Sequence, residues 1–323
     1  MTEREWNVLL PKDIDPAGPE SIDDIASFTS ISEFGLAPDD LKPHIDQFDA
    51  IILRKAELTG AVLEAADNLK IIAKHGVGLD NVDIDAASEH GIIVCNTPGA
   101  NARSVAEHAL TLLLGVNRRL VAMDSATRNG KWDRQRWSSH EIAGKTVGLF
   151  GCGDIGQVLA ELADCLDLDV LGYDPYLGED DLPDVITKVE ETSTLFEQSD
   201  AVSIHSPLTD ETHHAISAQE LEELGAEGIL INTARGPIVD ESALVTALRN
   251  EVIFGAGIDV FEREPPADDN ALFDLENVIL SQHVGGVTRE AMRRMSTGAA
   301  ECVRARYRGE TPDTAVNAGE SDS

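Results

Sequence analysis

Short runs of hydrophobic residues alternate with segments of helical periodicity along the first hundred residues. The runs are brief and continuous, whereas the segments between them carry apolar residues three or four positions apart. We predict strands at 6–10, 50–53, 70–74 and 92–95, and helices at 58–66 and 84–89. Strands that alternate with helices are typical of a doubly wound parallel sheet, which helices cover on both faces.

A second set of strands begins after a long helix. Asn101 precedes a helix predicted over 102–119, and an irregular segment with Trp132 and Trp137 follows. Strands are then predicted at 146–150, 168–173, 201–205, 228–232, 254–258 and 277–280. No strand remains for the last predicted helix, 289–308, so we expect it to return to the first domain and the polar tail from Glu310 to fray. The predicted domains are residues 1–101 with 290–323, and residues 102–289.

A glycine-rich turn follows the first strand of the second set. Its sequence, Gly151-Cys152-Gly153-Asp154-Ile155-Gly156, leads into a helical segment that reaches Leu166. Gly151 permits a tight turn, Gly153 admits a pyrophosphate, and Gly156 allows close helix–strand packing. Asp174 ends the next strand, where its carboxylate would bind ribose hydroxyls and repel a 2′-phosphate. The pattern predicts a Rossmann-type domain that binds NAD; the alternative is a glycine-rich turn in another βαβ unit.

The composition indicates a folded and strongly acidic protein. The 323 residues include 59 acidic and 25 basic side chains, a formal net charge of −34. Such a charge excludes a nucleic-acid binder, which needs a basic footprint, and suggests a solvated surface suited to a halophile's cytoplasm. The four cysteines lack metal-ligand spacing, so we expect reduced thiols and no metal. The first residues lack a signal-peptide pattern and no apolar run is long enough to span a membrane, so we expect a cytoplasmic protein.

Three segments that follow late strands carry polar residues suited to catalysis. They are Asn232-Thr233-Ala234-Arg235, Asp259 to Glu264, and Ser281-Gln282-His283. Ligands of open α/β sheets bind outside the carboxyl ends of the strands. The three segments are therefore candidate parts of one active site.

With these segments included, the chain from about Arg54 to Val303 resembles the D-isomer-specific 2-hydroxyacid dehydrogenases, and within them the phosphoglycerate dehydrogenase branch. The resemblance rests on 75–83, 96–99, 104–107, 130–132, the glycine-rich turn and the three polar segments. It implies an NAD-dependent enzyme, with a Rossmann-type domain inserted in a flavodoxin-like substrate domain. It also implies a homodimer that packs through the segment of Trp132 and Trp137. No regulatory domain is expected after residue 310, and hence no control by serine.

The resemblance also assigns roles to individual residues. His283 would accept the hydroxyl proton, Glu264 would favour its imidazolium form, and Arg235 would polarise the carbonyl oxygen. The backbone of Val77 and Gly78 would hold the substrate carboxylate in the cleft between the domains. The implied cofactor contacts are Gly151, Gly153, Asp154, Ile155, Gly156, Asp174, His205, Pro207 and Thr212 on the adenosine and phosphate side, and Thr233, Ala234, Asp259 and Gly285 near the nicotinamide.

Two positions depart from the family pattern, and they bear on the substrate. Lys74 stands where many members have Arg, and Gln282 replaces a commoner proline. Arg54 matches the position at which phosphoglycerate dehydrogenases hold the substrate phosphate, and Lys74 would add positive charge; alternatively, Arg54 only pairs with a carboxylate. The substrate remains open between 3-phosphoglycerate, hydroxypyruvate or glyoxylate, and other 2-oxo acids.

Two further functions share features with this pattern. Corepressors of the C-terminal-binding-protein type share the fold and the catalytic triad, but they need peptide-binding surfaces that this sequence does not reveal. Formate dehydrogenases have glutamine in place of the acid partner of the histidine, so Glu264 argues against that activity.

Overall fold

The computed structural model describes residues 4–318, which fold into two compact α/β units. The first unit comprises Met1–Asn101 and Val287–Ser323, and the second comprises Ala102–Gly286. The predicted second boundary, between 289 and 290, lies three residues later than the one in the structure. Residues 1–3 and 319–323, which the sequence assigned to the first domain, lie outside the described part. Both sheets are parallel throughout, so the predicted fold class of two doubly wound parallel-sheet domains is confirmed.

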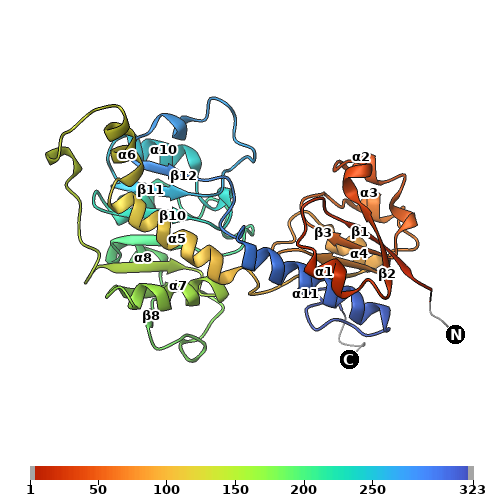
Figure 1. Ribbon diagram of the computed structural model, residues 1–323. Helices are drawn as coiled ribbons and strands as arrows, with labels where there is room; N and C mark the ends of the chain where they lie inside the picture. The colour runs from red at the N-terminus through yellow and green to blue at the C-terminus, as the bar shows by residue number, and fades with distance from the viewer. Residues whose placement is uncertain (1–3, 319–323) are drawn as a thin grey trace. The chain divides into compact units, whose positions relative to one another are not determined.

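The first unit is built on a five-stranded sheet (Figure 1). Its strands are β1 (Trp6–Leu10), β2 (Ala26–Ser30), β3 (Ala50–Leu53), β4 (Ile71–Lys74) and β5 (Ile93–Cys95). Their spatial order is β2-β1-β3-β4-β5, the flavodoxin-like order with its switch point between β1 and β3. The central strands β3 and β4 are buried along their whole length because helices cover both faces.

Helices cover both faces of this sheet, and successive residues of each strand point to opposite faces. They are α1 (Ala17–Ser21), α2 (Pro38–Leu41), α3 (Gly60–Leu63), α4 (Ile84–Glu89) and α11 (Arg289–Tyr307). Ile51 and Leu53 point to the face of α2, α3 and α4. Ala50 and Ile52 point to the opposite face, where Ala299 of α11 is packed. The last helix therefore completes the core of the first unit.

The second unit has a seven-stranded sheet (Figure 1). Its strands are β6 (Thr146–Phe150), β7 (Asp169–Tyr173), β8 (Ile186–Lys188), β9 (Ala201–Ile204), β10 (Ile229–Asn232), β11 (Gly255–Ile258) and β12 (Val278–Leu280). The order β12-β11-β10-β9-β6-β7-β8 is the Rossmann order with one strand added. The switch point lies between β6 and β9, where a dinucleotide binds in this fold.

Two layers of helices enclose the second sheet. They are α5 (Ala102–Asn117), α7 (Asp154–Asp164), α8 (Thr192–Gln198), α9 (Ala218–Leu224) and α10 (Glu241–Arg249), whereas α6 (Leu120–Arg128) belongs to neither layer. Residues of α5 and α7 form one core with the sheet, and residues of α8, α9 and α10 form the other. Short 3-10 helices lie at Ile31–Glu33, Ile45–Gln47, Gln135–Trp137, Glu179–Asp181, Gly236–Ile238 and Ala271–Asp274. No helix among residues 4–318 has the length and apolar character needed to cross a bilayer.

The structure corrects the sequence analysis at several peripheral elements. The edge strands β2 and β8 and the helix α6, which contains no buried residue, were not predicted from the sequence. A helix was predicted over 58–66, whereas α3 covers only Gly60–Leu63. The tail was expected to fray, yet Val316 donates its N–H to Val94 of β5 at 2.8 Å. The side chain of Asn317 also bonds the backbone of Ile92 and Val94.

Candidate active site

The carboxyl ends of three adjacent strands bring the predicted polar segments to one edge of the second sheet. The register aligns the last residues of β10, β11 and β12. Thr233, Asp259 and Ser281 therefore leave the sheet side by side. Each of the three polar segments begins at this edge, so the predicted catalytic residues of the second unit share one location.

His283 and Glu264 form a hydrogen-bonded pair at this edge. The distance from His283 Nδ1 to Glu264 Oε2 is 2.7 Å, and both side chains are partly exposed. Glu264 Oε1 also accepts the N–H of Phe261 at 3.1 Å. Burial opposes ionisation of Glu264, but the bond from His283 and its positive charge outweigh that effect, so the pKa of the Glu264 carboxyl lies below its usual value. Glu264 is thus an anion that orients the ring of His283 through Nδ1, while Nε2 has no hydrogen-bond partner among the described residues.

Asp259 fixes the backbone of the His283 loop. His283 has a φ of 53°, a left-handed conformation uncommon for a residue with a side chain. Its N–H donates to the main-chain oxygen of Asp259 at 2.7 Å. The Asp259 carboxylate, which is 1% exposed, accepts the N–H groups of Val284 and Gly285. Asp259 therefore sets the loop conformation, and its contact with the nicotinamide amide stays a prediction.

The turn that carries Arg235 packs directly against the segment that carries Glu264. Asn232 shapes this turn by donating to the Arg235 carbonyl oxygen and accepting the N–H of Ala234. A Cβ on Gly236 would lie 1.9 Å from the Phe261 carbonyl oxygen. Only glycine permits two backbones to approach this closely. Gly236 therefore sets how near the Arg235 turn lies to the segment of Glu264.

The glycine-rich turn has the geometry that a pyrophosphate needs. Gly151 has a φ of 99°, and a Cβ there would lie 2.6 Å from the backbone nitrogen of Ser206. A Cβ on Gly156 would lie 2.5 Å from the Gly151 carbonyl oxygen, whereas one on Gly153 would meet nothing within 4 Å. The open space is therefore at Gly153, which directly precedes α7. Asp154 and Ile155 form the first turn of that helix, whose N–H groups attract phosphate.

Asp174 is oriented by the glycine-rich turn itself. One carboxylate oxygen accepts the N–H of Cys152 and the other accepts the N–H of Tyr176, both at 3.0 Å. Burial, together with the nearby charge of Asp174, raises the pKa of the Cys152 thiol to about 12. The carboxylate is therefore held beside the turn at the end of β7, as a ribose-binding acid requires.

Buried polar atoms without partners line the neighbouring strand ends. Within residues 4–318, the hydroxyls of Ser206 and Thr233 and both ring nitrogens of His205 have no hydrogen-bond partner. Burial lowers the pKa of His205 to about 3, so its ring is neutral. Buried polar groups are rarely left unsatisfied in native proteins. His205 and Ser206 lie against Gly151 of the glycine-rich turn and Thr233 precedes Ala234, so these groups lie at the strand ends where this fold binds a dinucleotide.

The rest of the 205–214 loop is held by internal hydrogen bonds. The hydroxyl of Thr212 donates to the carbonyl oxygen of Pro207 at 2.7 Å, and it also accepts the N–H of Thr209. Tyr176 donates its hydroxyl to Glu211 at 2.8 Å, which links this loop to the residues after β7. Thr212 and Pro207 thus shape the loop, and their contact with adenine stays a prediction.

In the first unit, the loop after β4 presents backbone donors. Gly76 has a φ of 142° and is tied to Thr97 by hydrogen bonds in both directions. The side chain of Asn96 donates to the Val77 carbonyl oxygen at 2.8 Å. Within the described residues, the N–H groups of Val77 and Gly78 have no acceptor. Two adjacent free donors are the arrangement that a carboxylate would need.

Arg54 and Lys74 occupy different environments in the first unit. The Lys74 side chain is buried, and its ammonium group donates to the Arg54 carbonyl oxygen and to Asn81. Arg54 is half-buried and donates to the carbonyl oxygen of Asp13 at 3.3 Å. Within residues 4–318 it forms no ion pair with a carboxylate, so its charge is not neutralised by one there. Lys74 therefore supports the backbone at Arg54, whereas Arg54 itself is accessible to an anion.

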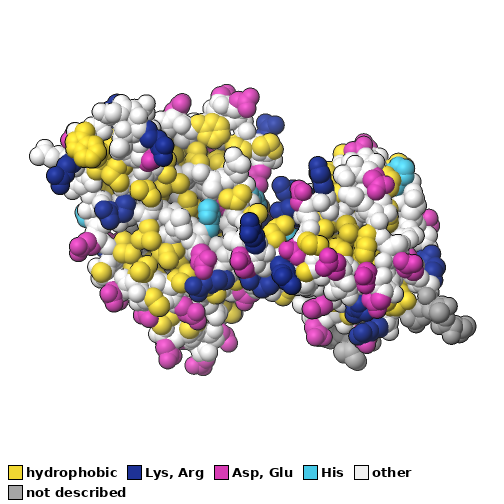
Figure 2. Space-filling view, in the orientation of Figure 1, with side chains coloured by type: hydrophobic (Ala, Val, Ile, Leu, Met, Phe, Trp, Pro, Cys, Tyr) yellow, Lys and Arg dark blue, Asp and Glu magenta, His cyan; other side chains and the backbone are white. Residues whose placement is uncertain are grey.

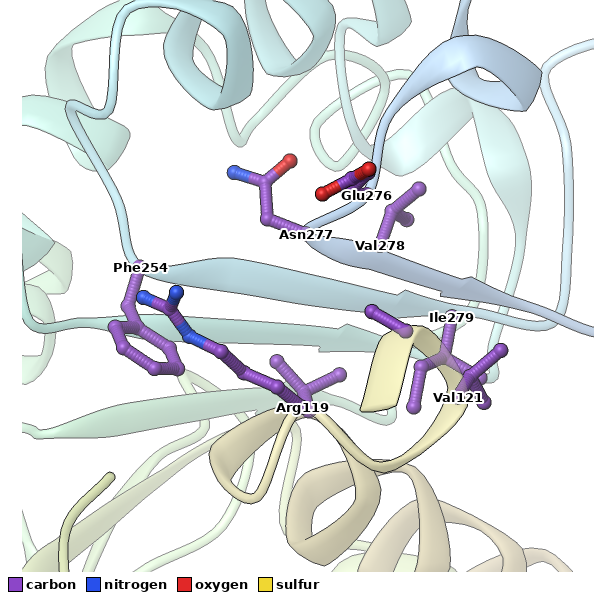
Figure 3. Close-up of a pocket in the computed structure, with 9 residues that line it drawn as sticks. Arg119, Val121, Phe254, Glu276, Asn277, Val278 and Ile279 are labelled. Carbon is purple, nitrogen blue, oxygen red and sulfur yellow. The ribbon is translucent and has the colours of Figure 1, made fainter. Parts of the chain in front are cut away.

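Two hollows in the second unit lie at the other edge of the sheet. A small one of about 20 Å³ is lined by residues that include Arg119, Phe254 and Asn277 (Figure 3). The Arg119 guanidinium lies 4.6 Å from the centre of the Phe254 ring. A larger hollow of about 700 Å³ adjoins the same residues and Trp137. Phe254 and Asn277 precede β11 and β12, so neither hollow belongs to the candidate active site.

The sequence analysis missed two residues that shape the site. Gly236 was not singled out, because a close approach to Phe261 cannot be read from local sequence. His108 lies on α5 and contacts Ser281 and Asp259. The sequence feature that could have indicated His108 is that it is a polar residue on the helix face that also carries the buried Val105 and Leu112.

Comparisons with known proteins agree with this arrangement. Residues 110–285 match the family model of the D-isomer specific 2-hydroxyacid dehydrogenase NAD binding domain. The chain is 37% identical to D-3-phosphoglycerate dehydrogenase of Archaeoglobus fulgidus over 88% of its own length and 54% of the relative's. It thus spans about half of that protein.

Two other similar proteins are matched over most of their length. A hydroxypyruvate reductase of Thermotoga maritima is 40% identical over 82% of this chain and 87% of the relative. The crystal structure of an NADPH-dependent glyoxylate/hydroxypyruvate reductase from Sinorhizobium meliloti superimposes with a TM-score of 0.85. That structure is 32% identical and covers 97% of both chains.

Proposed function

Since the chain belongs to the D-isomer specific 2-hydroxyacid dehydrogenase family, we propose that it interconverts a D-2-hydroxy acid and the corresponding 2-oxo acid with a nicotinamide cofactor. The observation that carries the proposal is the His283–Glu264 pair at 2.7 Å, with the Arg235 turn packed against the same segment. A proton donor and a polarising cation are the two groups that carbonyl reduction requires.

The chemistry assigned to each side chain follows from its contacts. A bound nicotinamide supplies or accepts the hydride. His283 exchanges the hydroxyl proton at Nε2, because Nδ1 is bound to Glu264. Glu264 stabilises the protonated imidazole, which donates when a 2-oxo acid is reduced. Arg235 binds the substrate's carboxylate or carbonyl oxygen through its planar fork.

The test is turnover of a panel of 2-oxo acids with NADH, monitored at the nicotinamide absorbance. We expect measurable reduction of at least one member, and a loss of at least about 1,000-fold in kcat for His283→Ala. A matched control is His90→Ala, which removes a histidine of the first unit. A wild-type protein that reduces no 2-oxo acid and oxidises no 2-hydroxy acid would refute the proposal.

We propose NAD rather than NADP as the cofactor. The Asp174 carboxylate is held by two N–H groups and would lie against a 2′-phosphate. Like charges at contact distance cost several kcal/mol in a partly dry site. We expect kcat/KM to favour NADH over NADPH by about 100-fold, and Asp174→Ser to reduce that preference at least about 10-fold. Asp169→Asn, at the other end of β7, should leave it unchanged; equal efficiency with both cofactors in the wild type would refute the assignment.

For the substrate we propose 3-phosphoglycerate, with hydroxypyruvate or glyoxylate as the second candidate. The support is Arg54, whose charge no described carboxylate pairs with. Charge-assisted bonds to phosphate contribute about 1.5–3 kcal/mol, or roughly 10- to 150-fold in kcat/KM. Arg54→Ala should therefore weaken oxidation of 3-phosphoglycerate by that factor and change hydroxypyruvate reduction by less than about threefold. Lys55→Ala, the exposed neighbour, should affect neither; equal losses with both substrates would exclude a phosphate contact.

A homodimer is also proposed, through the segment that follows α5. Leu120, Val121 and Trp132 expose 55%, 55% and 78% of their surfaces. Large apolar side chains gathered in one region are typical of a protein interface. Sedimentation should give twice the chain mass for the wild type and a higher dimer dissociation constant for Trp132→Ser. A wild-type monomer at micromolar concentration would refute the dimer.

We further propose that the protein works in the salt-rich cytoplasm of a halophile. Figure 2 shows acidic side chains scattered over the visible surface of each unit. The net charge is −34, and all four cysteines are free thiols, as a reducing compartment requires.

A further inference from the structure

A buried polar network lies behind the loop that carries His283. Asp259, at the end of β11, is 1% exposed. Its Oδ1 accepts the Ser281 hydroxyl at 2.6 Å and the Val284 N–H at 3.0 Å, and its Oδ2 accepts the Gly285 N–H at 2.8 Å. Donors from both sides of His283 therefore converge on one carboxylate.

His108 of α5 closes this network from the helix side. Its Nε2 lies 2.9 Å from the Ser281 hydroxyl oxygen and 3.4 Å from Asp259 Oδ1. Because the Ser281 hydroxyl donates its only proton to Asp259, its oxygen can only accept from His108. The proton of a neutral His108 ring must therefore be on Nε2.

The network keeps Asp259 charged although it is buried. Burial opposes ionisation, but the bonds from His108, Ser281 and the two backbone N–H groups outweigh it and hold the pKa of Asp259 far below its usual value. An ionised acceptor binds backbone N–H groups more strongly than a neutral one. The left-handed backbone of His283 depends on these bonds, since its conformation is unfavourable on its own.

We propose that His108 is a positioning residue for the reaction, acting through Ser281 and Asp259 on the backbone of His283. The inference rests on the proposed function for its kinetic test. Among the described residues, no hydrogen bond or ring contact joins His108 to His283; His108 supplies an N–H to the Ser281 hydroxyl oxygen, whose proton points to Asp259. Without that N–H, only Asp259 holds the Ser281 hydroxyl, and the segment that carries His283 loses a bond that ties it to α5.

Two variants separate this role from simple packing. His108→Leu removes the N–H but still fills the position with a side chain, whereas His108→Gln can place an amide N–H near the position of Nε2. Glu107→Gln, on the exposed side of the same helix, is the matched control because Glu107 pairs only with Arg103 among the described residues. Thermal melts of all three show whether the second unit is intact.

The first measurement is steady-state reduction of a 2-oxo acid. We expect kcat to fall about 10-fold in His108→Leu, with NADH affinity changed less than about threefold. His108→Gln should recover kcat to within about threefold of the wild type, and Glu107→Gln should match the wild type. In the background of Glu264→Gln, which already frees the His283 ring, His108→Leu should cost much less than 10-fold.

The second measurement does not depend on turnover. The ring signals of His283, followed by NMR at one fixed pH, should shift in His108→Leu relative to the wild type, because the ring is held less firmly against Glu264. A wild-type kcat and unchanged His283 ring signals in His108→Leu would overturn the proposal. The proposal would also be overturned if kcat fell equally in His108→Leu and His108→Gln and if both variants melted at correspondingly lower temperatures. If the wild type turns over no substrate, the proposed function fails, and the NMR comparison of the His283 ring signals still decides the role of His108.

Discussion

Replacing Gly236 with alanine should separate the proposed catalytic residues Arg235 and Glu264 without removing either of them. A Cβ at this position would lie 1.9 Å from the Phe261 carbonyl oxygen, 2.0 Å from the Phe261 carbonyl carbon and 2.4 Å from the Glu262 nitrogen. All three atoms belong to the backbone, so no side chain can rotate away. The Arg235 turn must therefore move away from the segment of Glu264.

The size of the effect follows from these distances. Ordinary carbon–oxygen contact begins at about 3.2 Å, so the two backbones must separate by about 1.3 Å. A misplacement of about 1 Å costs on the order of 100-fold in rate, or about 2.7 kcal/mol. Overpacking a tight contact costs a further 1–3 kcal/mol or so of folding free energy. In a unit of this size that lowers the melting temperature by roughly 2–12 °C.

The assay compares Gly236→Ala with Gly178→Ala. Gly178 is exposed, has an ordinary φ of −77°, and its added Cβ would meet only the end of the Asp181 side chain at 3.3 Å. We expect kcat to fall about 100-fold in Gly236→Ala while NADH affinity, measured by fluorescence, changes little. Gly178→Ala should keep wild-type kcat and stability. If Gly236→Ala retains kcat within threefold, the spacing of Arg235 and Glu264 does not govern the reaction.

Three further predictions concern charge. Glu264→Gln should move the fall in 2-oxo acid reduction with rising pH to lower pH, since the protonated imidazole of His283 loses its anionic partner; an unchanged pH–rate profile would contradict the pair. His205 is buried with its pKa lowered to about 3, so the unfolded chain binds a proton below about pH 6.5 that the folded protein does not. Stability should therefore be full above pH 6.5 and fall with decreasing pH, by about 2 kcal/mol at pH 5. The free energy of unfolding of His205→Leu, measured with urea at several pH values, should lack this part of the pH dependence. The same dependence on pH in both proteins would refute the assignment to His205. Activity and melting temperature should rise from low to molar KCl, because the screening length falls to about 3 Å and repulsion among side chains with a net charge of −34 weakens. A melting temperature that stays constant or falls over this range would mean that the acidity has another purpose.

The sequence alone determined the features that depend on local patterning. Buried parallel strands read as continuous apolar runs, so the central strands β3, β6 and β10 could be located within a residue or so. The glycine-rich turn was recognisable because its glycine spacing, the strand before it and the helix after it all lie in one continuous stretch of sequence. The edge strands β2 and β8 escaped detection because an edge strand is only partly buried and its sequence stays mixed.

The tertiary structure decided what depends on contacts between distant segments. Gly236 and Phe261 meet across the sheet edge, as do His108 and Ser281, which are 173 positions apart. The buried ammonium of Lys74 bonds the Arg54 backbone and Asn81, contacts that the sequence did not reveal, and its role toward substrate stays a prediction. A sequence pattern reports which chemical groups a chain contains and which face of an element they occupy. The partner of each group is set by strand order and backbone approach, because these bring together residues that local spacing cannot relate.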